Sequence, residues 1–112
     1  MRLKILRADE TITHVALLGR LDVQGVNEVQ YEFLHQTTSL PKATLVDLSQ
    51  TTYIASLGIG MLVSAAKHLE RNGVKMVLLG PPALVRKALE AAGLDQVIPI
   101  AEKEEAALEV LR

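Results

Sequence analysis

The alternation of apolar and polar positions divides the chain into strand-like and helix-like segments. Residues 3–8 (LKILRA) and 10–19 (ETITHVALLG) alternate or run β-branched around a short polar connection, which predicts a hairpin of two strands. Three further short apolar runs predict strands, of which the last contains Pro99 and belongs at an edge or a strand end: ATLVDLS (43–49), VKMVLLG (74–80) and QVIPI (96–100).

Four intervening segments carry apolar residues at helical spacing, namely residues 20–38, 60–73, 81–93 and 102–112. Pro41 follows the first of them, and Asn72-Gly73 ends the second. The resulting order ββαβαβαβα predicts an α/β fold, formed by a single domain over residues 1–112, with a mixed sheet of about five strands. Helices are expected mainly on one face of this sheet, and residues 50–55 (QTTYIA) are expected to form a loop.

Composition excludes several classes of function. Twelve Lys and Arg against thirteen Asp and Glu, without a block of like charge, argue against nucleic acid or an anionic membrane as the main partner. The chain has no cysteine, and its three histidines lie far apart, so no metal site or cofactor is expected. No apolar run approaches the length of a membrane span or a signal segment, which makes the cytoplasm the default location.

The stretch YIASLGIGML, residues 53–62, places a lone serine at the start of a predicted helix. Ser56 is therefore either an N-cap, which is the ordinary role of a serine here, or an exposed hydroxyl open to docking and modification. Gly58 and Gly60 favour the second interpretation, because glycine in a first helical turn costs about 1 kcal/mol and is useful where another molecule approaches closely. Of the apolar residues around the serine, Ile59 and Leu62 are expected in the core.

The remaining apolar residues of this stretch, Leu57 and Met61, are the better candidates for a contact surface. Asp22 precedes a helix, where an N-cap is its ordinary role. Asp47 lies inside an apolar strand, where a buried acid must find donors, and it is expected either to accept backbone N–H groups of the following loop or to make a functional contact. Thr51 and Thr52 offer further hydroxyls, for which hydrogen bonding within the turn is the ordinary role.

Catalysis finds little support, because no G-x-S-x-G arrangement surrounds the serine and none of the histidines can be placed beside it. The protein is therefore not expected to be an enzyme.

Nearly the whole chain resembles a known family. The segment VDLSQTTYIASLGIGMLVSAAKHLERNGVKMVLLGPPALVRKALEAAGLDQVIPI, together with GRLDVQGVNEVQYEFL upstream, is similar to the STAS domain of anti-sigma factor antagonists. In that family a hydrophobic strand ends in D-L-S and is followed by I-D-S-S/T-G-L-G and a helix, and a G-x-L-D segment precedes the first helix. One position departs from this pattern, because Ala55 stands where the family has the acid before the serine.

The resemblance implies a STAS-like fold and a regulator of transcription that acts by partner switching. Unphosphorylated, such a protein binds an anti-sigma factor serine kinase; phosphorylation of the serine releases the kinase, and a PP2C-type phosphatase restores the serine. Ser56 corresponds to the phosphoacceptor, and the expected partner contacts are Asp22, Asp47, Thr52, Leu57, Gly58 and Met61. The oligomeric state is left open, a homodimer included.

Two alternatives belong to other classes of function. The protein would be a non-switching STAS scaffold of a signalling assembly if the missing acid reflects a lost modification. It would instead be the STAS component of a lipid-transport complex if it assembled with membrane ATPase subunits.

Overall fold

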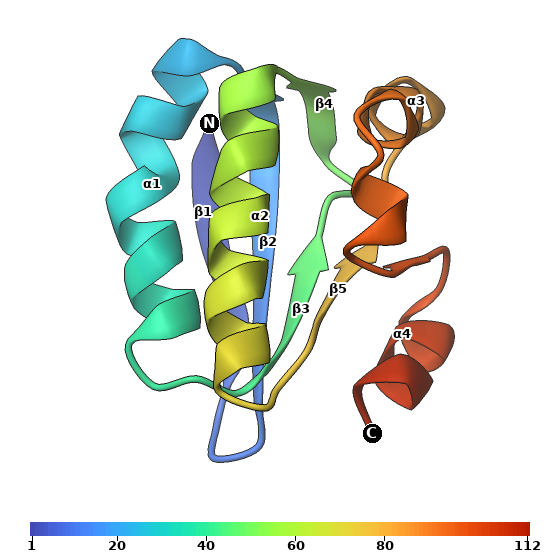
Figure 1. Ribbon diagram of the computed structural model, residues 1–112. Coiled ribbons are helices and arrows are strands. Elements are labelled where there is room, and N and C mark those ends of the chain that lie inside the picture. The colour runs from blue at the N-terminus through green and yellow to red at the C-terminus, as the bar shows by residue number, and fades with distance from the viewer.

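The chain begins with the predicted hairpin, in which β1 (Arg2–Ala8) pairs antiparallel with β2 (Ile12–Leu21). Asp9 holds the turn, because its Oδ1 accepts the N–H groups of Thr11 at 2.9 Å and Ile12 at 3.0 Å. The computed structural model describes all residues, 1–112 (Figure 1). Strand β1 forms one edge of the sheet.

Parallel strands extend the sheet from β2 in the order β1-β2-β3-β5-β6. They are β3 (Ala43–Asp47), β5 (Met76–Leu79) and β6 (Ile100–Ala101). The mixed sheet with an antiparallel hairpin is thus confirmed. The last strand is shorter than predicted, because Leu94–Gln96 form a 3-10 turn, η1, and only two residues after Pro99 pair with β5.

Residues 50–55 are not the expected loop. Thr51–Ile54 form a strand, β4, that pairs in parallel with the upper part of β2, above the part of β2 that pairs with β3. The sheet therefore has six strands, because the single long strand β2 pairs with two short strands, β3 and then β4, along its length. A four-residue strand with exposed Thr52 and Tyr53 between buried Thr51 and Ile54 gives little apolar periodicity, which is why the pattern did not predict it.

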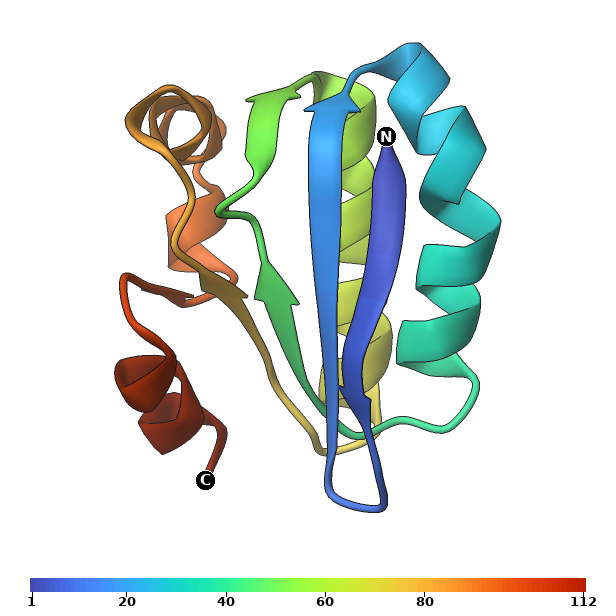
Figure 2. The same ribbon diagram turned by 180° about the vertical axis from the view of Figure 1, so that it is seen from behind.

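Helices cover one face of the sheet more fully than the other, as predicted. Helices α1 (Val23–Thr38) and α2 (Ser56–Arg71) lie side by side on one face, and α3 (Ala83–Ala91) adds Val85 and Leu89 to the same core (Figure 1). Figure 2 shows α4 (Glu104–Leu111) on the other face, where Ala107 packs with β3 and β5 residues. The back of β1 and β2 carries no helix (Figure 2).

Candidate functional site at the carboxyl ends of β2 and β4

The strands β2 and β4 end together, and each leads directly into a helix. Their register pairs Arg20 with Tyr53 and Leu21 with Ile54, and the Ala55 N–H donates to the Leu21 carbonyl at 3.0 Å. Helices α1 and α2 therefore begin next to each other at the same end of the sheet (Figure 1). We call the residues gathered here the Ser56 corner: Arg20, Asp22, Val23, Tyr53, Ser56 and Leu57.

Ser56 is exposed and is the first residue of α2. The N-cap is Ala55, whose backbone is extended and whose side chain caps nothing, so the interpretation of Ser56 as an N-cap is wrong. The first intrahelical bond runs from the Ile59 N–H to the Ala55 carbonyl at 3.1 Å. The N–H groups of Ser56, Leu57 and Gly58 thus have no partner, and they add positive potential beside the serine hydroxyl.

The two glycines behind the serine have different roles. Gly58 is buried, and a Cβ there would lie 2.8 Å from Leu21 Cγ and 3.0 Å from the Leu21 carbonyl oxygen. The space at Gly58 is therefore taken by the chain itself, and the prediction that this glycine contacts a partner is wrong. Gly60 is exposed, and a Cβ there would meet nothing within 4 Å.

Of the two apolar residues of α2 that were predicted to form a contact surface, only one is exposed. Leu57 is 46% exposed, as a contact residue must be, whereas Met61 is only 3% exposed. Met61 belongs to the core beneath α2, and its assignment to the contact surface is wrong. Helical geometry explains the error: residues 58, 61, 62 and 65 share the buried stripe, while residue 57 faces away from it.

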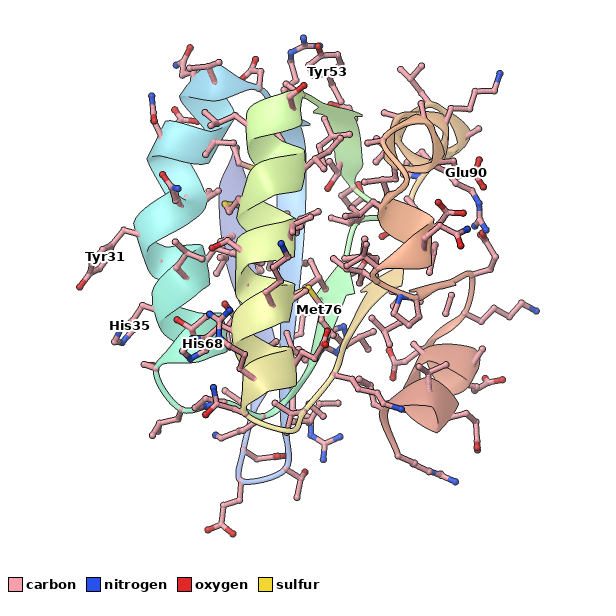
Figure 3. The ribbon with its side chains drawn as sticks, viewed as in Figure 1. Tyr31, His35, Tyr53, His68, Met76 and Glu90 are labelled. Carbon is pink, nitrogen blue, oxygen red and sulfur yellow. The ribbon has the colours of Figure 1, made fainter.

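Three residues of the corner, Arg20, Val23 and Tyr53, were not singled out from the sequence. The Arg20 guanidinium lies over the Tyr53 ring, 4.4 Å from its centroid, and Arg20 Nε lies 3.4 Å from Asp22 Oδ2. Figure 3 shows Tyr53 at the end of the molecule where α2 begins. Arg20 and Tyr53 meet only because β4 pairs with β2, so recognising the strand β4 would have been the signal that brings them together.

Asp22 caps α1 as predicted. Its Oδ1 accepts the Gly25 N–H at 2.8 Å, and this bond is the main reason why the pKa of Asp22 is lowered from 3.8; the hydrogen bond and charge of Arg20 act in the same direction. The carboxylate is thus ionised at neutral pH. Asp22 directly follows Leu21, and Ser56 directly follows Ala55. Because the Ala55 N–H donates to the Leu21 carbonyl, the side chains of Asp22 and Ser56 start from neighbouring backbone positions.

Asp47 lies apart from Ser56, Thr51 has a structural contact, and Thr52 is exposed. Asp47 pairs with Ala16, five residues along β2 from Leu21, a distance of about 16 Å. It shares the face of β3 with Leu45, which packs against α4, and it accepts the Ser49 N–H at 2.8 Å, so the predicted backbone contact is confirmed. The Thr51 hydroxyl donates to the Leu17 carbonyl, across strands rather than within a turn, while Thr52 stays exposed on β4.

No group of three or more His, Asp or Glu side chains is arranged to hold a metal ion. None of the four helices combines the length and the apolar character that crossing a membrane requires.

The comparison with known proteins agrees with the arrangement of these elements. The family model described as the STAS domain matches residues 4–107. The chain belongs to the STAS domain family. Family membership supports the prediction of a binding regulator rather than an enzyme.

Several STAS relatives are similar over most of their length. An anti-sigma-B factor antagonist of Staphylococcus epidermidis is 28% identical over 101 residues, which are 86% of this chain and 94% of the relative. The structure of an anti-sigma factor antagonist from Mycobacterium paratuberculosis superimposes with a TM-score of 0.85 at 19% identity, over 99% of this chain and 95% of that one. The Bacillus cell fate determinant SpoIIAA in its phosphorylated form gives a TM-score of 0.70 at 20% identity, over 99% of this chain and all of that chain (100%).

In this STAS domain, the start of α2 lacks a side-chain cap, and a substitution that supplies one should raise the stability of the fold. We expect Ala55→Asp to raise the free energy of unfolding by about 1 kcal/mol, because the extended backbone at residue 55 lets a carboxylate accept a free N–H of the first turn. Urea unfolding of both proteins measures the difference. Pro82→Asp at the N-cap of α3 is a matched control, since that position also lacks a side-chain cap. An unchanged or lower stability of Ala55→Asp would mean that these N–H groups are not accessible to a cap.

The lowered pKa of Asp22 predicts a dependence of stability on pH. A carboxyl whose pKa is lower in the folded state stabilises the fold above its unfolded pKa, and this contribution is lost as pH falls through the folded value. We therefore expect wild type to exceed Asp22→Asn in stability at neutral pH, and the difference to shrink below about pH 4. Asparagine keeps the capping oxygen, and Asp9, whose pKa is also lowered, is present in both proteins. A difference that stays constant down to acid pH would contradict this expectation.

Proposed function

We propose that this STAS protein is an anti-sigma factor antagonist that regulates transcription by partner switching. With Ser56 unphosphorylated it binds an anti-sigma factor serine kinase, and phosphorylation of Ser56 by that kinase releases it. A PP2C-type phosphatase restores the hydroxyl. Because the kinase uses ATP, the exchange takes place in the cytoplasm. The observation that carries the proposal is the exposed Ser56 hydroxyl at the uncapped start of α2.

The start of α2 is suited to accept a phosphate without unfolding. Phosphoserine adds close to two negative charges, which the free N–H groups and the helix dipole favour at this position. Ala55 leaves these N–H groups free, whereas an acid at residue 55 would compete for them. The departure from the family pattern therefore does not remove the site for the modification.

The surroundings of Ser56 are suited to a switchable contact. Val23, Tyr53 and Leu57 are exposed by 60%, 37% and 46%, and Arg20 lies on the tyrosine ring. Tyrosine and arginine are enriched among the residues that dominate binding energy. A phosphate at Ser56 would carry charge into this apolar surface, next to the ionised Asp22, and both desolvation and repulsion would weaken the complex.

The relatives support the same role. The Staphylococcus epidermidis protein is named an anti-sigma-B factor antagonist, and SpoIIAA is known in a phosphorylated form. Both resemble this chain over most of its length.

Binding measurements with three proteins test the proposal. With the serine kinase as partner, we expect wild type and Ser56→Ala to bind equally and Ser56→Asp to bind at least tenfold more weakly. Incubation with the kinase and ATP should add one phosphate to wild type and none to Ser56→Ala. Equal binding of all three proteins would overturn the proposed switch and favour the alternative of a non-switching scaffold. Failure of any of them to bind the kinase would overturn the antagonist role.

A further inference from the structure

A cavity of about 290 Å³ lies beside the C-terminal half of α2. Its floor is formed by Met76 of β5 and Ile98 after η1, which belong to the core and are only 3% and 1% exposed. Figure 3 shows Met76 beside the C-terminal half of α2. Val97 and Val110 also line the cavity and are 52% and 36% exposed. The cavity therefore has a closed apolar floor and an apolar rim that solvent reaches.

The cavity exists because the elements around it leave a gap. Helices α2 and α4 lie on opposite faces of the sheet (Figure 2). The edge strand β6 is only two residues long and pairs with Leu78 and Leu79, so residues 97–99 beside the start of β5 form no strand. On α2 the gap is lined by Ala66, whose side chain ends at Cβ and fills little of it. The gap is thus a consequence of the fold, and the packed core closes its base.

Two charged residues line the cavity, Glu70 of α2 and Lys75 just before β5, and the other lining residues are apolar. Both charged residues are exposed, and neither forms an ion pair within the chain. Their carboxylate and ammonium groups are therefore available to a ligand. A ligand with a single charge meets a like charge as well as an opposite one, whereas a ligand with one charge of each sign can pair with both.

We propose that this cavity binds a free aliphatic amino acid of the size of leucine, in its zwitterionic form. The carboxylate of the ligand pairs with Lys75, and its ammonium group pairs with Glu70. Its branched side chain lies over Met76, between Ala66 and Val110. Small-molecule sites have this character, with mainly apolar walls and a few polar groups that fix the orientation of the ligand. No residue of the Ser56 corner lines the cavity, so this is a second and separate site.

The volume and the charges of the cavity limit the ligand. An apolar cavity of about 150 Å³ holds one benzene molecule. The cavity here, of about 290 Å³, therefore holds a molecule of up to about twice that size, which includes leucine. A nucleotide is larger and its phosphates require several cations, whereas Lys75 is the only cation that lines this cavity. An internal residue of a peptide lacks both of the charges that Lys75 and Glu70 match.

NMR titration of the ¹⁵N-labelled protein tests the proposal with three probes that share one branched carbon chain. They are L-leucine, 4-methylpentanoate, which lacks the ammonium group, and 3-methylbutylamine, which lacks the carboxylate. We expect leucine to shift the amides of Ala66, Val97 and Val110 and to leave those of the Ser56 corner unchanged. Each of the other two probes should bind about fivefold more weakly than leucine, because it loses one exposed ion pair and still meets a like charge.

Neutral variants separate the roles of the two charges. Glu70→Gln should weaken the binding of leucine about fivefold without weakening that of 4-methylpentanoate, which has no ammonium group. Lys75→Gln should weaken leucine to the same extent without weakening 3-methylbutylamine. Glu32→Gln removes an exposed acid of α1 outside the cavity, and this matched control should bind leucine as wild type does. Ala66→Leu fills the cavity and should weaken all three probes at least tenfold, with thermal unfolding as the check that the variant is folded.

Three results would overturn the proposal. Binding of 4-methylpentanoate to wild type as tightly as leucine would make the site one for apolar acids. Leucine binding that both Glu70→Gln and Lys75→Gln leave unchanged would show that these charges do not hold the ligand. Absence of any shift in a saturated leucine solution would show that the cavity does not bind an amino acid. None of these measurements involves the serine kinase, so they leave the proposed function untouched.

Discussion

Gly25→Ala is expected to destabilise the protein by about 3 kcal/mol, which corresponds to a fall of about 10 °C in Tm. Gly25 is buried in the first turn of α1, where a Cβ would collide with the Arg20 carbonyl oxygen and approach Asp22 Oδ1 to 3.3 Å. The collision is with backbone, so no side-chain rotation relieves it. Either α1 or the end of β2 must move, and the Asp22 cap on the Gly25 N–H is disturbed in the process.

Two other glycines provide controls for this substitution. Gly60→Ala, in an exposed turn of α2 with free space around it, is expected to stabilise the protein by about 0.5–1 kcal/mol, because alanine has the higher helix propensity. Gly58→Ala should fall between the two, since its nearest contacts include the movable Leu21 side chain. Thermal and urea unfolding rank the three variants. Equal stability of Gly25→Ala and Gly60→Ala would show that the close approach of α1 to β2 is not required.

The same glycines show what the sequence could and could not predict. The order of elements followed from apolar periodicity and from breakers such as Pro41 and Gly73, because these signals are local. That Gly58 makes room for Leu21 depends on how closely α2 approaches β2, a distance between segments that are far apart in the chain. From the sequence alone, a glycine next to an exposed serine looks the same whether its space is filled by a partner or by the protein.

The sequence predicted the residues of the candidate site that lie at helix starts, but not those that the pairing of β4 with β2 brings together. Ser56, Asp22 and Leu57 were identified because each lies at a helix start, and a helix start can be recognised from a few neighbouring residues in the sequence. Arg20 and Tyr53 were missed because their contact depends on the parallel pairing of β4 with β2, which four residues of alternating exposure do not reveal. Asp47 looked close to Ser56 along the chain, but β3 and β4 occupy successive stretches of β2, which separates the two residues.

Leu57→Asp is expected to weaken binding of the serine kinase proposed above by about 100-fold, or about 2.7 kcal/mol, while leaving the fold unchanged. Leu57 is half exposed one residue after Ser56, and it is the apolar side chain of α2 that faces outward at the Ser56 corner. Aspartate at this position breaks few folding contacts, because Leu57 is half exposed. Its charge must be desolvated when the partner covers it, and this weakens binding. Calorimetry with purified kinase gives the affinity, and circular dichroism checks the fold.

Leu40→Asp is the matched control, because Leu40 is 71% exposed in the connection between α1 and β3, at the opposite end of the sheet. This variant changes the same residue type and the same charge, so a general effect of added acid would weaken both proteins alike. The Ser56 corner predicts a loss for Leu57→Asp only. Equal affinities of the two variants would place the kinase contact elsewhere on the molecule. This would hold even if Ser56 is phosphorylated, because a kinase can modify an exposed serine that it does not use for stable binding.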